Sequence, residues 1–376
     1  MNYHFSTGTL LSYCLILYKA VALYKLWSFR AAHPFAFLGL PTPNSFKLLV
    51  FRRTMPLWIG TGQGSRLYLD IIACRFGHAE YFMFETRMLG RDAKYTGYFF
   101  VLLAAVCWAM LGTVARVPLS HGISPLEVAF WRAFFGALFF VVHGLACGLY
   151  HVKLKDGLIL SGFGIFGVAM LFAVMQVAIQ RGGVALAVIL LYTAPFWVAV
   201  FSRIFFKEQL TPLKIIALVI ALAGVSLICL SGGGLPEKAA PLGLFCGLLS
   251  GFAYSLHYVF CKAYLGRFSA VTIYMYCIPV GALILFLLTD FTPKVFSDWL
   301  SFICLGFVST YAAYWAYCES LRRLSPIRVA VLCNLEPMIS AALAFMFWDE
   351  LFAAVGIAGA FMVFGAIFMI MSDKKS

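Results

Sequence analysis

One acidic and one basic side chain stand in the middle of long apolar stretches of this chain. Glu336 comes immediately before Pro337, and Arg132 lies in a separate apolar segment. A carboxylate among apolar residues needs a partner or a watery space, and there it can take up and release a proton. Because proline lacks an N–H, it disturbs the backbone hydrogen bonds around it. The alternatives for Glu336 are a bond to backbone groups freed by Pro337 and a fixed ion pair.

Arg132 has three alternative roles. If its segment crosses a membrane, it lies about 12 Å below the boundary of a core roughly 30 Å thick, near the depth of Glu336. It then pairs with Glu336, binds the carboxylate of a small molecule with its planar fork, or ties two helices together. The sequence gives depth but not the direction in which either side chain points.

The composition of the chain indicates a membrane protein. With 63% hydrophobic and 11% charged residues, the chain is far more apolar than a typical water-soluble protein. Segments of roughly 20 apolar residues are long enough to span a bilayer. Ten spans are predicted, at residues 97–116, 125–148, 157–179, 184–205, 213–230, 242–263, 270–289, 299–320, 326–347 and 353–371. Capping residues followed by proline mark several starts, as in Ser124-Pro125, Thr211-Pro212 and Ser325-Pro326.

One sequence pattern occurs twice in about the last 280 residues. Pro195 and Pro337 are each followed thirteen residues later by a glutamate, Glu208 and Glu350. Upstream, the stretch from Gly97 through Trp108 to Arg116 is matched by Gly243 through Tyr254 to Lys262. The sequence therefore predicts an all-α integral membrane protein of two five-helix repeats, at residues 95–231 and 241–371, joined by a Gly/Pro-rich linker. Duplicated units of this kind are typical of transporters.

The distribution of Lys and Arg predicts the orientation of the spans. If the segment before the first span is cytoplasmic, fifteen basic residues fall inside and four outside, namely Arg116, Arg181, Lys238 and Lys294. This bias follows the positive-inside rule and places both ends of the ten-helix unit in the cytoplasm. Five spans per repeat then make the second repeat inverted. The same clusters between spans explain the net charge of +13 without nucleic-acid binding.

The paired five-helix repeats, the mid-helix prolines and the helix ends Lys207-Glu208 and Asp349-Glu350 resemble the EamA-type branch of the drug/metabolite transporter superfamily. The resemblance covers about residues 95–371. It implies a ten-helix transporter, commonly an exporter of amino acids or other small metabolites, with a central cavity between the repeats. It does not fix the cargo.

Matching positions near the middle of the membrane add further candidates. Tyr192 and Asn334 each lie three residues before a proline, while Trp108 and Tyr254 match in the first and sixth spans. Such positions fall near the two-fold axis where inverted-repeat transporters bind their substrates. The alternative is that these side chains fill a tightly packed bundle. His257 is given no functional role, because a hydrogen bond to a neighbouring helix would account for it.

Residues 1–94 align with neither repeat. Residues 8–27 are their one span candidate, and Lys19 and Lys25 interrupt it at a cost of about 2.5–3.5 kcal/mol each. We expect that this extension comes from a start codon assigned too early, with Met83 or Met88 as the native start. Peptides from residues 1–80 in the mature protein would contradict this.

The sequence favours a secondary transporter that works by alternating access. With the resemblance, we expect export of small metabolites such as amino acids or amines across the cytoplasmic membrane. No GxxxxGK[ST] loop, HExxH or GxSxG motif is present, so we expect neither ATP hydrolysis nor enzyme activity. A membrane-embedded enzyme, a passive channel and a structural membrane protein are the alternatives. The eleven cysteines lack zinc-site spacing, so no metal or cofactor is expected. Membrane lipid and a small-molecule substrate are the expected partners, and dimerisation through Ala217 and Ala221 competes with lipid packing.

Overall fold

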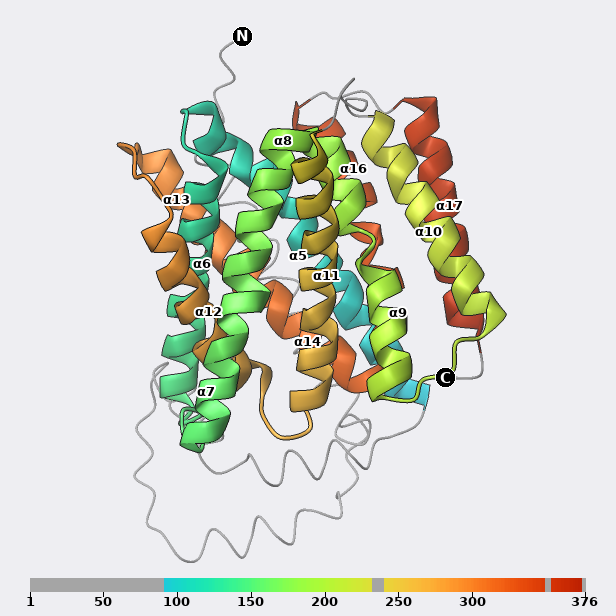
Figure 1. Cartoon of the computed structure of the whole chain (residues 1–376), viewed down its shortest axis with the longest axis horizontal. Coiled ribbons are helices and arrows are strands. Elements are labelled where there is room, and N and C mark those ends of the chain that lie inside the picture. The colour runs from blue at the N-terminus through green and yellow to red at the C-terminus, as the bar shows by residue number, and fades with distance from the viewer. Residues whose placement is uncertain (1–90, 232–239, 349–352, 374–376) are drawn as a thin grey trace, which may run out of the picture. The chain divides into compact units, whose positions relative to one another are not determined.

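The computed structural model describes residues 91–231, 240–348 and 353–373, which fold into helices joined by short loops (Figure 1). The first repeat contains α5 (Arg91–Ser120), α6 (Pro125–Ala146), α7 (Leu154–Phe163), the π-helix η1 (Gly164–Met170), α8 (Leu171–Leu191), α9 (Ala194–Phe205) and α10 (Pro212–Ser231). The second contains α11 (Pro241–Tyr264), α12 (Ala270–Leu287), α13 (Phe296–Cys304), the π-helix η2 (Leu305–Ala312), α14 (Ala313–Arg323), α15 (Pro326–Cys333), α16 (Leu335–Trp348) and α17 (Ala354–Ser372). The expectations for residues 1–90, and those for Asp349 and Glu350, lie outside the described residues.

The described helices make up the ten predicted spans. Nine are long and apolar enough to cross a membrane, and the shorter apolar α9 adds to them. The longest, Leu154–Leu191, contains the third span and the start of the fourth. The two are separated at Gly183, which has φ 76° and ψ 160°, a backbone conformation that glycine adopts without strain. The third span ends at this glycine, and residues 184–205 form the fourth. The predicted all-α fold is confirmed, and the largest shift of a span's end is at α5, which begins at Arg91 rather than residue 97.

The helices pack in pairs that the repeat relates to one another. The two second spans, α6 and α12, contact each other, and so do the two fifth spans, α10 and α17, which run side by side at one edge in Figure 1. In addition, α5 packs on η2 and α14, just as α11 packs on η1 and α8. Reciprocal packing of this kind is what an inverted repeat about a two-fold axis produces.

Matching glycines allow close approaches between these helices. A Cβ atom on Gly136 of α6 would overlap the Thr310 side chain, and one on Gly281 of α12 would overlap the Val168 side chain. Val168 and Thr310 lie 142 residues apart, the spacing that also separates the two mid-helix prolines. Only glycine, which has no side chain, leaves room for these two contacts. The second span of each repeat therefore packs directly against the π segment of the other.

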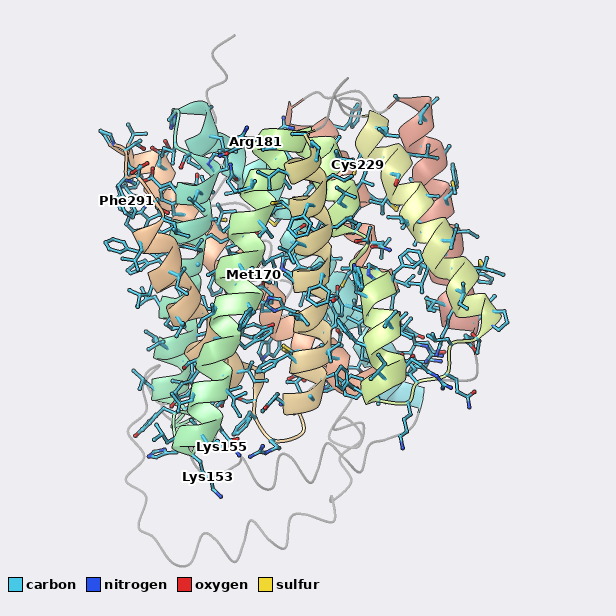
Figure 2. All side chains as sticks on the ribbon, in the orientation of Figure 1. Lys153, Lys155, Met170, Arg181, Cys229 and Phe291 are labelled. Atoms are coloured by element: carbon cyan, nitrogen blue, oxygen red, sulfur yellow. The ribbon has the colours of Figure 1, made fainter. Side chains whose placement is uncertain are left out.

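The two π segments, η1 and η2, were not predicted. They occupy the same place in the third and eighth spans, since Gly164 of η1 and Gly306 of η2 are also 142 residues apart. Met170, which ends η1, lies about midway between Lys155 and Arg181 in Figure 2. A π turn inside an α-helix keeps the apolar pattern of the segment, so hydropathy does not reveal it, and such turns are frequent at functional sites.

The predicted helix starts are correct, although one lacks its capping bond. The Ser124 hydroxyl accepts the Glu127 backbone N–H at 3.1 Å, and the Thr211 hydroxyl accepts the Lys214 N–H at 3.2 Å. Ser325 occupies the cap position of α15, but its hydroxyl bonds to no described residue. The prolines that follow each cap fit the first turn, where a backbone N–H has no helical partner.

Three basic residues lie at the two ends of the helices. Figure 2 shows Lys153 and Lys155 at one end of the helices and Arg181 at the other. Lys153 and Lys155 belong to the predicted cytoplasmic group and Arg181 to the external group, so the predicted sides correspond to opposite ends of the bundle.

Two small side chains suggested for a dimer contact lie inside the protein. Ala217 and Ala221 of α10 are buried within the protomer, so they are not available to the dimer contact for which the sequence suggested them. Dimerisation itself stays a prediction. The described cysteines are free thiols, and most are buried in helix contacts, which is the role expected of them.

Candidate functional site

Breaks near the middle of the fourth and ninth spans mark the candidate site. In the fourth span α8 ends at Leu191, and Tyr192 and Thr193 form a turn before α9. In the ninth span Asn334 separates α15 from α16. Pro195 and Pro337 follow these breaks within the first helical turn of α9 and α16, where a missing N–H costs nothing. The prolines therefore restart helices at matching points, as the disturbed backbone pairing predicted.

Glu336 lies at the first turn of α16 and is half-buried. The Tyr192 hydroxyl lies near its carboxyl, and Arg132 of α6 lies within electrostatic range. Glu336 forms no ion pair with any described residue. Its other titratable neighbours are Tyr254, Tyr314 and Cys333. Because these groups come from several spans of both repeats, the carboxyl faces the interior between the repeats and not the lipid.

Arg132 is buried, with 8% of its surface exposed, and two of its nitrogens are already bonded. Its Nε donates to the Thr310 hydroxyl at 3.0 Å, and its Nη2 donates to the Ser309 carbonyl at 3.2 Å. Its guanidinium also lies over the Phe172 ring, 5.1 Å from the ring centre. The bidentate edge between Nε and Nη2 is therefore occupied by the eighth span, so the geometry favours the tie between helices, while the positive charge still acts on Glu336.

Aromatic side chains from three spans surround the same region. The rings of Trp108 and Tyr254 lie 6.3 Å apart, so the matching residues of the first and sixth spans contact each other. Trp108 also packs on Tyr314 and Tyr317, at 5.7 and 5.4 Å between ring centres. Tyr254 is half-buried, whereas Trp108 is 5% exposed. The structure thus brings Trp108 to the site mainly as packing and leaves Tyr254 the more accessible of the two.

Asn334 has a buried side-chain oxygen that bonds to no described residue. The residue is 2% exposed, and its Oδ1 has no hydrogen-bond partner within the described chain. A buried amide oxygen without a partner costs about 1–3 kcal/mol. Its position at the helix break, two residues before Glu336, makes it the clearest unfilled hydrogen-bonding group beside the site.

A match to a family model decides the family. The model of the EamA-like transporter family matches residues 95–230 and again residues 241–372. The chain belongs to the EamA-like transporter family. This family is part of the drug/metabolite transporter superfamily, so the resemblance noted in the sequence is confirmed.

Curated relatives of this EamA-like protein carry the same general description. An uncharacterized transporter of Archaeoglobus fulgidus is 26% identical over 71% of this chain and 93% of its own. The uncharacterized transporter YdfC of Bacillus subtilis is 22% identical over 66% of this chain and 82% of its own. A solved protein structure aligns with a TM-score of 0.64 at 18% identity, covering 73% of this chain and 96% of that one, and shows the shared fold. The protein is therefore a membrane transporter.

Other charges of this EamA-like protein lie in fixed pairs away from the site. Glu127 pairs with Lys294 at 2.6 Å, and Glu319 pairs with Arg323 at 2.7 Å. Glu208 pairs with Lys214 at 2.9 Å. Each of these acids therefore has a fixed basic partner. Within the described part of the chain, no group of three His, Cys, Asp or Glu side chains is placed to hold a metal ion.

Two residues of the site region were not among the candidates. Tyr314 follows η2 and lies between Trp108 and His257, and His257 is fully buried against η1. The expected bond from His257 to a neighbouring helix is present, because its Nε2 lies 2.5 Å from the Gly167 carbonyl. The repeat offered one signal for Tyr314, since it matches Phe172 at the 142-residue spacing.

Proposed function

We propose that this EamA-like protein is a proton-coupled secondary exporter of small metabolites, amino acids or amines, and that Glu336 carries the proton. The carrying observation is that Glu336 is a half-buried acid at the break of the ninth span, near the hydroxyl of Tyr192 of the other repeat and without an ion pair among the described residues. Such a carboxyl can be protonated on one side of the membrane and deprotonated on the other when access alternates.

The remaining candidates have distinct parts in this proposal. Arg132 tunes the charge on Glu336, Asn334 offers its free oxygen to a donor on the substrate, and Tyr254 provides an accessible aromatic wall. Trp108 holds Tyr254 in place through ring contact. The amine or ammonium group shared by amino acids and amines suits this set, because it donates hydrogen bonds and is attracted by carboxylate and aromatic faces.

The proposal places the protein in the cytoplasmic membrane with both ends of the ten-span unit inside the cell and without enzyme activity. The opposite positions of Lys153 and Arg181 along the helices support this orientation (Figure 2). Export is supported by the resemblance to exporters of this superfamily. The protein then uses inward proton movement to drive its cargo out.

Transport by purified protein in liposomes tests the proposal. Radiolabelled amino acids and amines are offered to proteoliposomes and to empty liposomes under an imposed pH gradient, and accumulation is measured before and after a protonophore. We expect accumulation above equilibrium that the protonophore abolishes. Equilibration without accumulation would indicate a passive channel, and accumulation unaffected by the protonophore would contradict proton coupling.

A further inference from the structure

The two π segments have the same backbone carbonyl bonded by a long polar side chain. Ser309 of η2 and Gly167 of η1 occupy equivalent positions, 142 residues apart. Arg132 donates from Nη2 to the Ser309 carbonyl at 3.2 Å, and His257 donates from Nε2 to the Gly167 carbonyl at 2.5 Å. Since a carbonyl only accepts hydrogen bonds, the Nε2 of His257 carries the proton in this contact.

Each of these two side chains also stacks on an aromatic ring of the opposite π-bulged span. The Arg132 guanidinium lies 5.1 Å from the ring centre of Phe172, which follows η1. The His257 ring lies 5.5 Å from that of Tyr314, which follows η2, and the two planes differ by 15°. Phe172 and Tyr314 are themselves equivalent at the 142-residue spacing. Arg132 thus bonds to the eighth span and stacks on the third, whereas His257 bonds to the third and stacks on the eighth.

The arrangement is not a by-product of the duplicated sequence. The second and seventh spans match at a spacing of 145 residues, as Gly136 and Gly281 do, so the equivalent of Arg132 is Cys277. The first and sixth spans match at 146 residues, as Trp108 and Tyr254 do, so the equivalent of His257 is Leu111. Neither can replace its counterpart as a long hydrogen-bond donor. Two unrelated positions therefore supply the same pair of contacts from different spans, which indicates that the contacts themselves matter.

Burial makes both contacts consequential. Arg132 is 8% exposed and His257 is fully buried. A π turn interrupts the regular i to i−4 pairing, and a buried carbonyl left without a donor is costly. The side-chain bond therefore holds one carbonyl of each π segment in place. Released from it, each becomes a point where the span can bend.

We propose that Arg132 and His257 are positioning residues that form a matched pair of cross-ties between the third and eighth spans. Together they hold the two repeats in one of the arrangements that alternating access requires. Breaking a tie frees one π segment and loosens its contact with the opposite span. The role of the ties in transport rests on the proposed function. Their existence does not, because the experiment below is made without substrate.

Hydrogen exchange of the full chain in lipid nanodiscs, read by mass spectrometry, tests the cross-ties. In His257→Leu we expect exchange to rise roughly tenfold, as for one lost buried hydrogen bond, in residues 164–170. It should also rise in residues 313–323, where only the ring contact is lost. His257→Gln retains an N–H donor without an imidazole ring, so it should restore protection in residues 164–170 and leave 313–323 exposed. The control is Ser255→Ala, since the Ser255 hydroxyl bonds only within its own helix, to the Phe252 carbonyl.

A second variant keeps the test independent of His257. Phe172→Leu removes the ring under Arg132 without touching the Arg132 hydrogen bonds, and we expect faster exchange in residues 305–312 of the other repeat. Faster exchange around residue 257 or 172 alone would overturn the inference, because it would show local packing and no tie. An equal change in Ser255→Ala would overturn it as well. Neither result would bear on whether the protein transports.

Discussion

The hydroxyl of Tyr192, at the helix break of the first repeat, lies near the carboxyl of Glu336, just after the helix break of the second. Each break is followed by a proline in the first turn of the next helix. The contact therefore joins the two repeats at their least regular points. A change of protonation at Glu336 alters this contact directly, which gives a physical route from proton binding to movement of one repeat against the other.

Removing the Tyr192 hydroxyl should slow gradient-driven transport without unfolding the protein. In Tyr192→Phe the ring still fills its buried site, and the carboxyl loses a neighbouring O–H donor, whose hydrogen bond to a charged group is worth about 1.5–3 kcal/mol. We expect initial rates in proteoliposomes to fall by roughly tenfold or more. Unchanged rates would show that the hydroxyl takes no part.

Asn334 should matter for transport more than for stability. Asn334→Leu replaces a buried amide whose Oδ1 has no partner in the described chain, and an apolar residue of similar volume avoids that cost. We expect a thermal midpoint equal to or above that of the wild type in detergent, together with a raised KM for transport. A clear loss of stability with an unchanged KM would make Asn334 a structural residue.

The buried pair Lys214 and Glu208 should be essential as a pair. Lys214 is fully buried, and its Nζ lies 2.9 Å from the Glu208 carboxyl. Breaking such a pair leaves an uncompensated charge and costs about 3–5 kcal/mol, whereas removing both charges costs much less. Thermal unfolding of Lys214→Met, Glu208→Gln and the double variant measures this. Additive losses in the double variant would contradict the pairing.

Two glycines with opposite surroundings provide a matched test of the packing between repeats. A side chain at Gly306 would overlap Phe135 of α6, whereas one at Gly365 of α17 would meet nothing within 4 Å. We expect Gly306→Val to destabilise the protein by about 1–3 kcal/mol or more through overpacking, and Gly365→Val to be nearly neutral. Equal thermal midpoints for the two variants would argue against close packing at η2.

Membrane orientation is testable with single cysteines and a membrane-impermeant maleimide. Arg181→Cys should be labelled in intact cells, and Lys153→Cys only after the membrane is opened, because the two residues lie at opposite ends of the helices (Figure 2). The unsubstituted protein controls for labelling of the native cysteines. The reverse pattern would invert the proposed topology.

The sequence predicted the features that depend on hydropathy and on the internal repeat. Apolar length defined the spans, and the duplicated prolines located the breaks beside Tyr192 and Asn334. The sequence could not show which way a side chain faces around a helix axis. It therefore left open whether Arg132 binds a substrate, and the structure shows two of its nitrogens bonded to the eighth span.

The π segments and His257 escaped prediction for a different reason. One extra residue in a helical turn leaves composition and spacing almost unchanged, so η1 and η2 look like ordinary apolar helix. His257 acts through its bond to the Gly167 carbonyl. A backbone carbonyl is present at every residue, so the sequence gives no sign of this contact. Ala217 and Ala221 were misassigned to the outer surface because small residues serve contacts within a protomer and between protomers equally well.

Transport by Glu336→Gln tests the central claim most directly. The variant retains the size of the side chain but cannot release a proton, and Glu319→Gln, which alters a paired acid near the end of α14, is the control. The substrate that the wild type accumulates is measured in two ways, as accumulation driven by a pH gradient and as exchange between equal pools without a gradient. The account predicts that Glu336→Gln loses accumulation while Glu319→Gln retains it, with exchange still detectable in both. Gradient-driven accumulation by Glu336→Gln at the wild-type level would contradict the account.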